Sequence, residues 1–201
     1  MTQVAGSTPY SWPYAGGIRP AAAALVVCGA GPSWSQRTSL DATVERNIAE
    51  LRAAARGAGA WVVLLDEEPP RAPFPPVADP SPDLAADAGD IWITSAGIDG
   101  FYGSALDATL HRRHVEQLVF AGRGFETVVH STLRRANDRG YECLTVVDAC
   151  VVLDPENRAG AVSSIEMSGG IFGAVASTRA VIDAFTSTAC AAPVPDNDSN
   201  T

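Results

Sequence analysis

Short apolar runs alternate with segments of helical spacing along most of the chain. Six such runs are expected to be strands, at residues 23–27, 60–65, 91–94, 118–121, 144–147 and 171–176. This alternation is typical of a parallel sheet with helices on both faces, because each connection between parallel strands has to cross back over the sheet. The sequence therefore predicts an α/β fold, a three-layer α/β/α domain with a six-stranded, mostly parallel, Rossmann-like sheet.

Two of the connecting segments show clear helix signals. In the first, Ser39 and Asp41 precede apolar residues at helical spacing and can cap a helix that Gly57 and Gly59 end. In the second, an apolar stripe from Val129 to Ala136 is ended by Gly140. Both segments are expected to be helices. The first forms a βα unit with the strand before it, and the second begins directly after a strand.

We expect three parts along the chain: an N-terminal arm at residues 1–20, a single domain at 21–186 and a flexible tail at 187–201. The arm contains Tyr10, Trp12 and Tyr14, too many aromatic residues for a free tail, so they are expected to pack on a neighbouring element or subunit. Residues 68–83 are rich in proline without periodicity, which predicts an extended surface loop. The tail is small and polar and is expected to fray.

Composition restricts the partners and the chemistry. A formal net charge of −9 argues against binding to a nucleic-acid backbone. The absence of a long apolar run and of a basic, then apolar, N-terminus argues against a membrane span and a secretory signal, and predicts a cytoplasmic protein. The four cysteines form no CxxC pair, so neither a metal site nor a disulfide framework is indicated, and no cofactor is expected. All 14 basic residues are arginine, which excludes any mechanism that needs a lysine ammonium group.

One segment, at residues 118–150, reads LVFAGRGFETVVHSTLRRANDRGYECLTVVDAC. It resembles the signature region of the isochorismatase-like cysteine hydrolases, with AG, ST, DRGY and DAC in register. The segments AAALVVCGA, GFYGSALDATL and IEMSGGIFGAVAST resemble other parts of that family, so the resemblance covers nearly the whole chain and implies the isochorismatase-like hydrolase fold. The opening PYSWPYAGGIRP is similar to the N-terminal extension of ureidoacrylate and biuret amidohydrolases, which implies an ancestral ureide or amide substrate.

The resemblance also implies where the catalytic residues of the family would lie. In the family a cysteine attacks an amide carbonyl, an aspartate takes the thiol proton and a lysine supports the thiolate. These positions fall on Val128, Cys28 and Ser95 respectively, so cysteine-dependent amide hydrolysis is predicted to be absent. Cleavage of the vinyl ether of isochorismate needs the same aspartate and is disfavoured as well. The family further implies a cis peptide bond at Arg123–Gly124.

A pocket is expected beyond the carboxyl ends of the strands, where parallel sheets bind their ligands. Its candidate lining is Cys28, Trp34, Ser95, Tyr102, Arg123, Gly124, Phe125, Glu126, Val128 and His130. Arg123 could pair with a carboxylate ligand, or with Glu126, or lie on the surface. Cys28 and His130 could be a relocated nucleophile and its base, or a buried cysteine and a partly exposed histidine that faces a neighbouring element.

Two classes of function remain from the sequence. The first is a pseudoenzyme that binds an active paralogue in a hetero-oligomer, forms a homo-oligomer, or holds a small-molecule ligand. The second is an enzyme of a specialised pathway that performs proton transfer, cyclisation or elimination without a thiolate, with Cys28, His130, Glu126 or Tyr102 as candidates. Replacement of all three family residues favours the pseudoenzyme.

Overall fold

A single sheet of six strands forms the centre of the computed structural model, which describes residues 2–68 and 84–190. The strands are β1 (Ala23–Cys28), β2 (Trp61–Glu67), β3 (Ile91–Ser95), β4 (Gln117–Arg123), β5 (Glu142–Val151) and β6 (Ala174–Ala176). Their order in the sheet is β3-β2-β1-β4-β5-β6, and every pairing is parallel. The predicted six-stranded α/β fold is confirmed, with a sheet that is entirely parallel.

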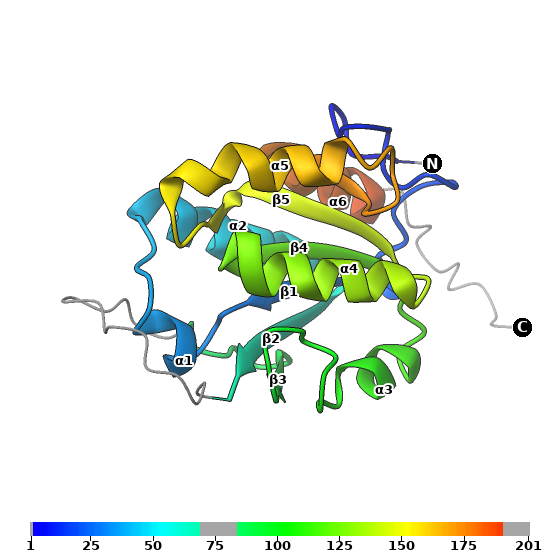
Figure 1. The fold of residues 1–201 in the computed structure, drawn as a ribbon. Helices are drawn as coiled ribbons and strands as arrows, with labels where there is room; N and C mark the ends of the chain where they lie inside the picture. Colours follow the sequence, from blue (N-terminus) through cyan, green and yellow to red (C-terminus); the bar gives the residue numbers. More distant parts are fainter. Residues whose placement is uncertain (1, 69–83, 191–201) are drawn as a thin grey trace, which may run out of the picture.

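Helices cover both faces of the sheet (Figure 1). On one face lie α2 (Ala42–Ala58) and α6 (Thr178–Cys190), and on the other lie α3 (Leu106–His111), α4 (His130–Asp138) and α5 (Arg158–Glu166). The shorter elements are η1 (Pro20–Ala22), α1 (Pro32–Ser35), the π-helical turn η2 (Phe125–Val129) and η3 (Pro155–Asn157). Two apolar clusters, one on each face, form the core.

Local sequence signals explain how the central elements begin and end. All six residues of β1 are buried, which is why this strand appears as a continuous apolar run. Helix α2 begins at Asp41, whose carboxylate accepts hydrogen bonds from the amides of Thr43 and Val44 at 2.8 and 2.9 Å. The helix ends at Gly59, which has a φ of 83° in the left-handed region. Of the predicted end residues Asp41 and Gly59 are confirmed, whereas Ser39 is not the cap and Gly57 lies within the last turn of the helix.

The N-terminal arm packs on the domain of its own chain. The Trp12 side chain is completely buried, and Thr8 forms an antiparallel bridge with Val175 through hydrogen bonds of 3.0 and 2.8 Å. The arm thereby covers the free edge of β6, which would otherwise present unpaired backbone groups. Tyr14 is 80% exposed on the single chain, so its predicted packing on a subunit stays a prediction.

The C-terminal helix extends further than expected. Helix α6 continues to Cys190, past the predicted domain end at residue 186. The hydroxyl groups of Thr186, Ser187 and Thr188 donate hydrogen bonds to carbonyls one turn earlier, so these small polar residues lie within the helix. Residues 191–201 of the predicted tail, and nearly all of the predicted loop at 68–83, lie outside the described residues.

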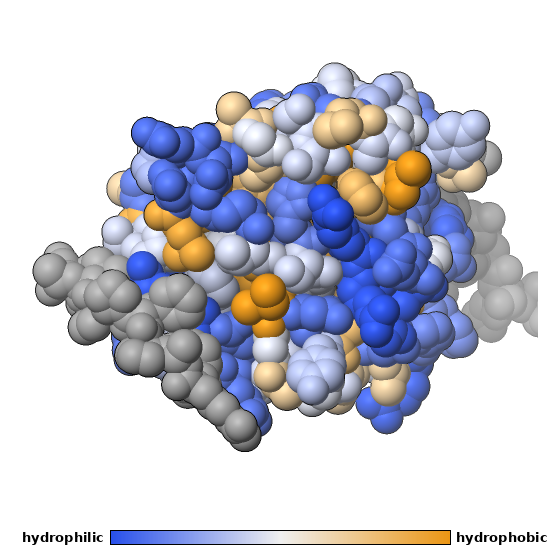
Figure 2. All heavy atoms as spheres, in the orientation of Figure 1, coloured by the Kyte–Doolittle hydropathy of each residue, from blue (hydrophilic) through white to orange (hydrophobic). Residues whose placement is uncertain are grey.

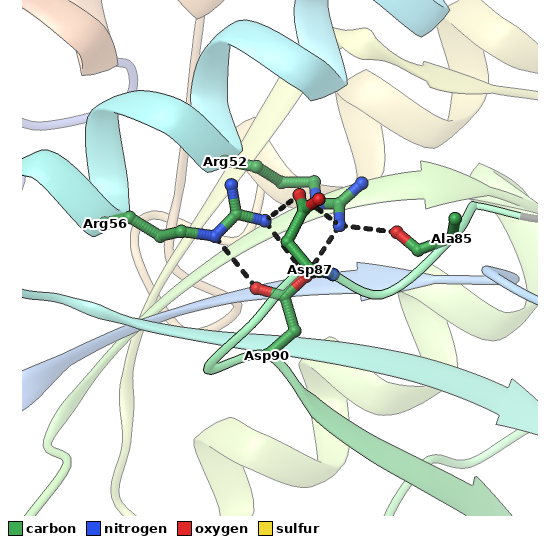
Figure 3. A network of polar contacts seen from close by, with 5 residues as sticks. All are labelled: Arg52, Arg56, Ala85, Asp87 and Asp90. Atoms are coloured by element: carbon green, nitrogen blue, oxygen red, sulfur yellow. Dashed lines mark hydrogen bonds and ion pairs between the residues drawn. The ribbon is translucent and has the colours of Figure 1, made fainter.

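A network of ion pairs fixes the segment that enters β3 (Figure 3). Arg52 and Arg56 of α2 both bind the carboxylate of Asp90, at distances of 2.6 and 2.9 Å. They also bind Asp87, at 3.2 and 2.6 Å, and Arg52 donates a further hydrogen bond to the carbonyl of Ala85. In the same segment the amide of Leu84 donates a hydrogen bond to the carbonyl of Ala30, so the network holds a stretch of chain that reaches the carboxyl edge of the sheet.

The surface drawn in Figure 2 is mostly hydrophilic. On the part of this face that the structure describes, hydrophobic side chains form separate spots and no continuous apolar patch. None of the helices in residues 2–68 and 84–190 is long and apolar enough to cross a membrane.

Candidate functional site

The predicted pocket region lies where strand order reverses. Strand β1 pairs with β2 on one side and with β4 on the other, which is the switch point at which parallel sheets form a crevice. Cys28 is the last residue of β1 and is paired in register with Gly122 of β4. The loops that follow these strands begin at Gly29 and Gly124, and both glycines have a left-handed φ, of 62° and 69°.

The indole ring of Trp34 fills the space between these two loops. A Cβ atom at Gly29 would lie 2.9 Å from Cγ of Trp34, and one at Gly124 would lie 2.5 Å from its Cη2. Only 1% of the Trp34 surface is exposed. The two glycines therefore let a large aromatic side chain occupy the crevice between the ends of β1 and β4.

The side chain of Arg123 also occupies the crevice between the two loops. Its side chain is completely buried, and Nη1 donates a hydrogen bond of 2.7 Å to the carbonyl oxygen of Gly29. The guanidinium thus joins the loop after β4 to the loop after β1. The expectations of a surface position and of an ion pair with Glu126 were wrong, because the close packing of the two loops encloses the side chain.

The expected cis peptide bond at Arg123–Gly124 is also wrong. The cis bonds in the described residues are Thr8–Pro9 and Trp12–Pro13, so the Arg123–Gly124 bond is trans. Gly124 turns the chain through its left-handed conformation, which glycine adopts without steric cost.

Cys28 and Val128 lie together in a buried apolar cluster. Cys28 is completely buried and Val128 is 1% exposed, and both belong to the cluster that contains Phe125. Burial raises the pKa of the Cys28 thiol far above its usual range, so the thiol is neutral near pH 7. Ser95, at the end of β3, is 1% exposed and donates a hydrogen bond of 2.8 Å to the carbonyl of Gly97. None of the three positions presents a charged or exposed group.

Glu126 of η2 and His130 of α4 point away from the crevice, toward the turn after β5 and toward α5. Oε1 of Glu126 accepts hydrogen bonds from the amides of Leu153 and Asp154, at 2.7 and 3.0 Å, and so holds the turn after β5. His130 is 7% exposed, and its Nε2 lies 2.9 Å from the carbonyl oxygen of Ala161, which requires a proton on Nε2. Burial lowers the pKa of His130, so the ring is neutral near pH 7. The predicted contact with a neighbouring element is confirmed, although the ring is buried instead of partly exposed.

The residues predicted to line a single pocket therefore lie in separate parts of the structure. The structure brings Cys28, Trp34, Arg123, Gly124, Phe125 and Val128 together at the ends of β1 and β4. Tyr102 is 65% exposed on the turn after β3, while Glu126 and His130 line a separate groove of about 450 Å³ between α4 and α5. Within the described part of the chain, no three His, Cys, Asp or Glu side chains are grouped so that they could hold a metal ion.

Two acidic residues at the end of β2 were not among the predicted site residues. Asp66 is 6% exposed, accepts a weak hydrogen bond from the amide of Ser33 at 3.4 Å, and has a buried Oδ1 atom without a hydrogen-bond partner. Burial raises the pKa of Asp66. Glu67 is 3% exposed and forms an ion pair of 2.5 Å with Arg37. The signal was present in WVVLLDEE, where two carboxylates directly follow an apolar run and so lie at the carboxyl edge of the sheet.

The family model described as the isochorismatase domain matches residues 23–180. Ureidoacrylate amidohydrolase RutB from Stutzerimonas stutzeri is 31% identical over 163 residues, which are 81% of this chain and 56% of that protein. The chain thus spans a little over half the length of this relative.

Solved structures share the fold. A cysteine hydrolase from Pseudomonas syringae pv. phaseolicola superimposes with a TM-score of 0.71 and 20% identity, over 85% of this chain and 95% of that one. An isochorismatase family protein from Burkholderia thailandensis has a TM-score of 0.71 and 23% identity, over 85% of this chain and 98% of that one. At such identities the likeness establishes the fold alone.

Proposed function

This chain belongs to the isochorismatase family, and we propose that it is a pseudoenzyme of that family whose role is binding instead of hydrolysis. The observation that carries the proposal is the packing at the ends of β1 and β4. Trp34, Arg123 and Val128 are all at most 1% exposed there, so side chains of the protein occupy the region where the family resemblance puts the reaction.

The chemistry of the three family positions supports the same proposal. Amide hydrolysis by a thiol needs a nucleophile, a base and a nearby cation. Val128 offers no nucleophilic atom, the buried Cys28 thiol is neutral and so is no base, and the Ser95 hydroxyl is engaged with the carbonyl of Gly97. These three residues therefore lack the nucleophile, base and cation that hydrolysis of ureidoacrylate, the substrate in the relative's name, would need.

Two binding roles follow from this proposal. The chain acts as a non-catalytic or regulatory partner of an active paralogue, or it holds a small ligand at the remodelled crevice. The second role is favoured by two buried polar atoms without hydrogen-bond partners, Nε1 of Trp34 and Oδ1 of Asp66. One is a donor and the other an acceptor, and buried polar groups in proteins are normally satisfied by a partner or by water.

The buried Asp66 also supports the alternative function, an enzyme with repurposed chemistry. A buried carboxyl group whose pKa is raised holds its proton more tightly than an exposed one and is suited to proton transfer. Such an enzyme would perform proton transfer, cyclisation or elimination and would lose activity on Asp66→Asn while keeping it on Cys28→Ser.

The test is an assay of the purified chain with ureidoacrylate, biuret, nicotinamide and isochorismate, with the RutB relative as the positive control. We expect no release of ammonia, and no pyruvate from isochorismate, above the background of buffer. Turnover of any of these substrates that is lost on Cys28→Ser would overturn the pseudoenzyme and make Cys28 the nucleophile. The partner role is tested by adding the chain to an active paralogue from the same organism: co-elution with a changed rate supports it, and separate elution with an unchanged rate contradicts it.

A further inference from the structure

A groove of about 650 Å³ lies at the edge of the sheet opposite to the crevice. It opens where β5 begins, at Glu142, whereas the crevice lies where β1 and β4 end. Part of its lining is Tyr10, Tyr14, Tyr141, Glu142, Gly170 and Ile171. None of these residues was a candidate for the pocket predicted from the sequence.

Aromatic rings form the walls of this groove. The rings of Tyr10 and Tyr14 lie 5.8 Å apart and nearly perpendicular, at 80°, so they make two walls of a corner. A Cβ atom at Gly170 would lie 3.1 Å from Cε1 of Tyr10, so the glycine leaves the space that the ring of Tyr10 occupies. Tyr14 is 80% exposed, which keeps the corner open to a ligand from solvent.

The groove carries a negative charge that its own lining does not neutralise. Glu142 contributes a carboxylate, which accepts a hydrogen bond from the amide of Tyr14 and so sits beside the aromatic corner. Among the described residues that line the groove, none carries a positive charge. Arg19 acts on Glu142 only through longer-range electrostatics, and its guanidinium is paired with Glu116.

From this arrangement we infer that the groove binds a small organic cation whose charge is covered by methyl groups, of the quaternary ammonium class. Aromatic faces attract cations through their ring quadrupole, and this combination of several rings recognises quaternary ammonium groups. A primary ammonium group or a metal ion would need several charged or closely placed oxygen ligands to replace its water, whereas the described lining of the groove holds one carboxylate, Glu142, beside the neutral side chains of Asn137 and the tyrosines. A methylated cation needs only the charge of Glu142 and the faces of Tyr10 and Tyr14.

The experiment is calorimetric titration of the full chain with choline and with its uncharged analogue 3,3-dimethylbutan-1-ol. We expect the analogue, Tyr14→Ala and Glu142→Gln each to weaken binding by about tenfold, the size of one desolvated cation–π or charge contact. Tyr14→Phe keeps the ring and should bind choline like the wild type. Tyr102→Ala, another exposed tyrosine but at a distant turn, is the matched control and should change nothing.

Three results would overturn the inference. One is the absence of choline binding, and another is equal binding of choline and the uncharged analogue. The third is a wild-type dimer that Tyr14→Ala converts to a monomer in sedimentation, which would make the groove an interface between two copies. Circular dichroism of Glu142→Gln shows whether a loss of binding comes from the missing charge or from a rearranged N-terminal arm. If Glu142→Gln does not fold, the Tyr14→Ala variant decides the question. The groove lies away from the crevice, so failure here leaves the pseudoenzyme proposal intact.

Discussion

Gly122 lies so close to Cys28 that a Cβ atom at Gly122 would be 2.0 Å from the carbonyl oxygen of Cys28. The two residues are partners in the pairing of β1 with β4, at the point where the sheet gives way to the crevice. Gly122 also has a φ of 121°, a conformation that side chains of L-residues rarely adopt. Backbone proximity and backbone conformation therefore both require glycine at this position.

We predict that Gly122→Ala destabilises the protein much more than left-handed strain alone, which is about 1–2 kcal/mol. The added methyl group meets backbone atoms, which cannot turn aside as a flexible side chain can. Gly140→Ala is the matched control, because Gly140 has a φ of 86° but open space around it. Urea denaturation should give the larger loss of unfolding free energy for Gly122→Ala, and equal losses would contradict the described close approach.

The ion-pair network gives a second prediction. The Asp90 side chain is completely buried and binds both Arg52 and Arg56, whereas the Asp87 side chain is 61% exposed. Removing Asp90 leaves the buried guanidinium of Arg52 with the exposed carboxylate of Asp87 as its remaining ion-pair partner, so Asp90→Ala should lower the free energy of unfolding by about 3 kcal/mol. Asp87→Ala should cost at most about 1 kcal/mol, as exposed pairs do. Similar losses in the two variants would show that burial does not determine the strength of this network.

The same network predicts a pH dependence. Burial alone would raise the pKa of Asp90, but hydrogen bonds from Arg56, the amide of Asp87 and Arg52 together lower it below the usual value. A lowered pKa in the folded state means that the unfolded chain binds the proton more tightly, so this stabilisation is present above the unfolded pKa of about 3.9. It is lost as the pH falls through the folded pKa. Between about pH 5 and about pH 7 this carboxyl group is ionised in both the folded and the unfolded chain, so the stability difference between wild type and Asp90→Ala should be constant there. The difference should shrink below about pH 4.

Thiol chemistry provides a fourth prediction. Cys28, Cys143 and Cys150 are free and buried, and burial raises the pKa of Cys150 to about 12 and those of the other two above their usual range. In a Cys190→Ser background, native protein at about pH 8 should react with a disulfide reagent at least about a hundredfold more slowly than denatured protein, since the thiolate is the reactive form. Rapid labelling of Cys28, located by mass spectrometry, would instead support a relocated nucleophile.

Residue patterns predicted the strands and the ends of α2 because those features depend on neighbours in the sequence. β1 is a buried apolar run, and Asp41 and Gly59 act within one turn of the helix they delimit. The position of Arg123 could not be predicted this way, because an arginine is usually exposed and its burial depends on a carbonyl oxygen supplied by Gly29, far away in the chain. The filling of the crevice by Trp34 likewise depends on two loops that meet only in the folded protein.

Asp66 shows a different limit. Its position after an apolar strand was visible, but its burial beside Ser33 depends on how the loop after β1 folds over the end of β2. The family resemblance directed attention to Cys28, Ser95 and Val128, which the structure shows as buried groups without charge. A pocket prediction based on that resemblance alone therefore included residues that face elsewhere, such as Tyr102, and omitted the carboxylates of β2.

The final prediction concerns restoration of hydrolysis. Val128→Cys alone should give no ammonia release from ureidoacrylate or nicotinamide, because a buried thiol without a base and a cation stays neutral, and residues that act as a unit are strongly non-additive. The triple change Cys28→Asp, Ser95→Lys and Val128→Cys supplies all three groups at the positions that the family resemblance implies, where a lysine would compensate the charge of the new aspartate. We expect slow but measurable turnover from the triple variant.

Addition of Trp34→Ala to the triple variant should raise that turnover. The indole lies against Gly29 and Gly124, so its removal frees space for a substrate beside the new cysteine. The matched control is Trp34→Ala in the otherwise unchanged chain, which opens the same space without supplying a nucleophile and should remain inactive. If Val128→Cys alone equals the triple variant, the supporting aspartate and lysine are dispensable. If Trp34→Ala alone hydrolyses these substrates, the chain already holds a working nucleophile, and the pseudoenzyme proposal fails.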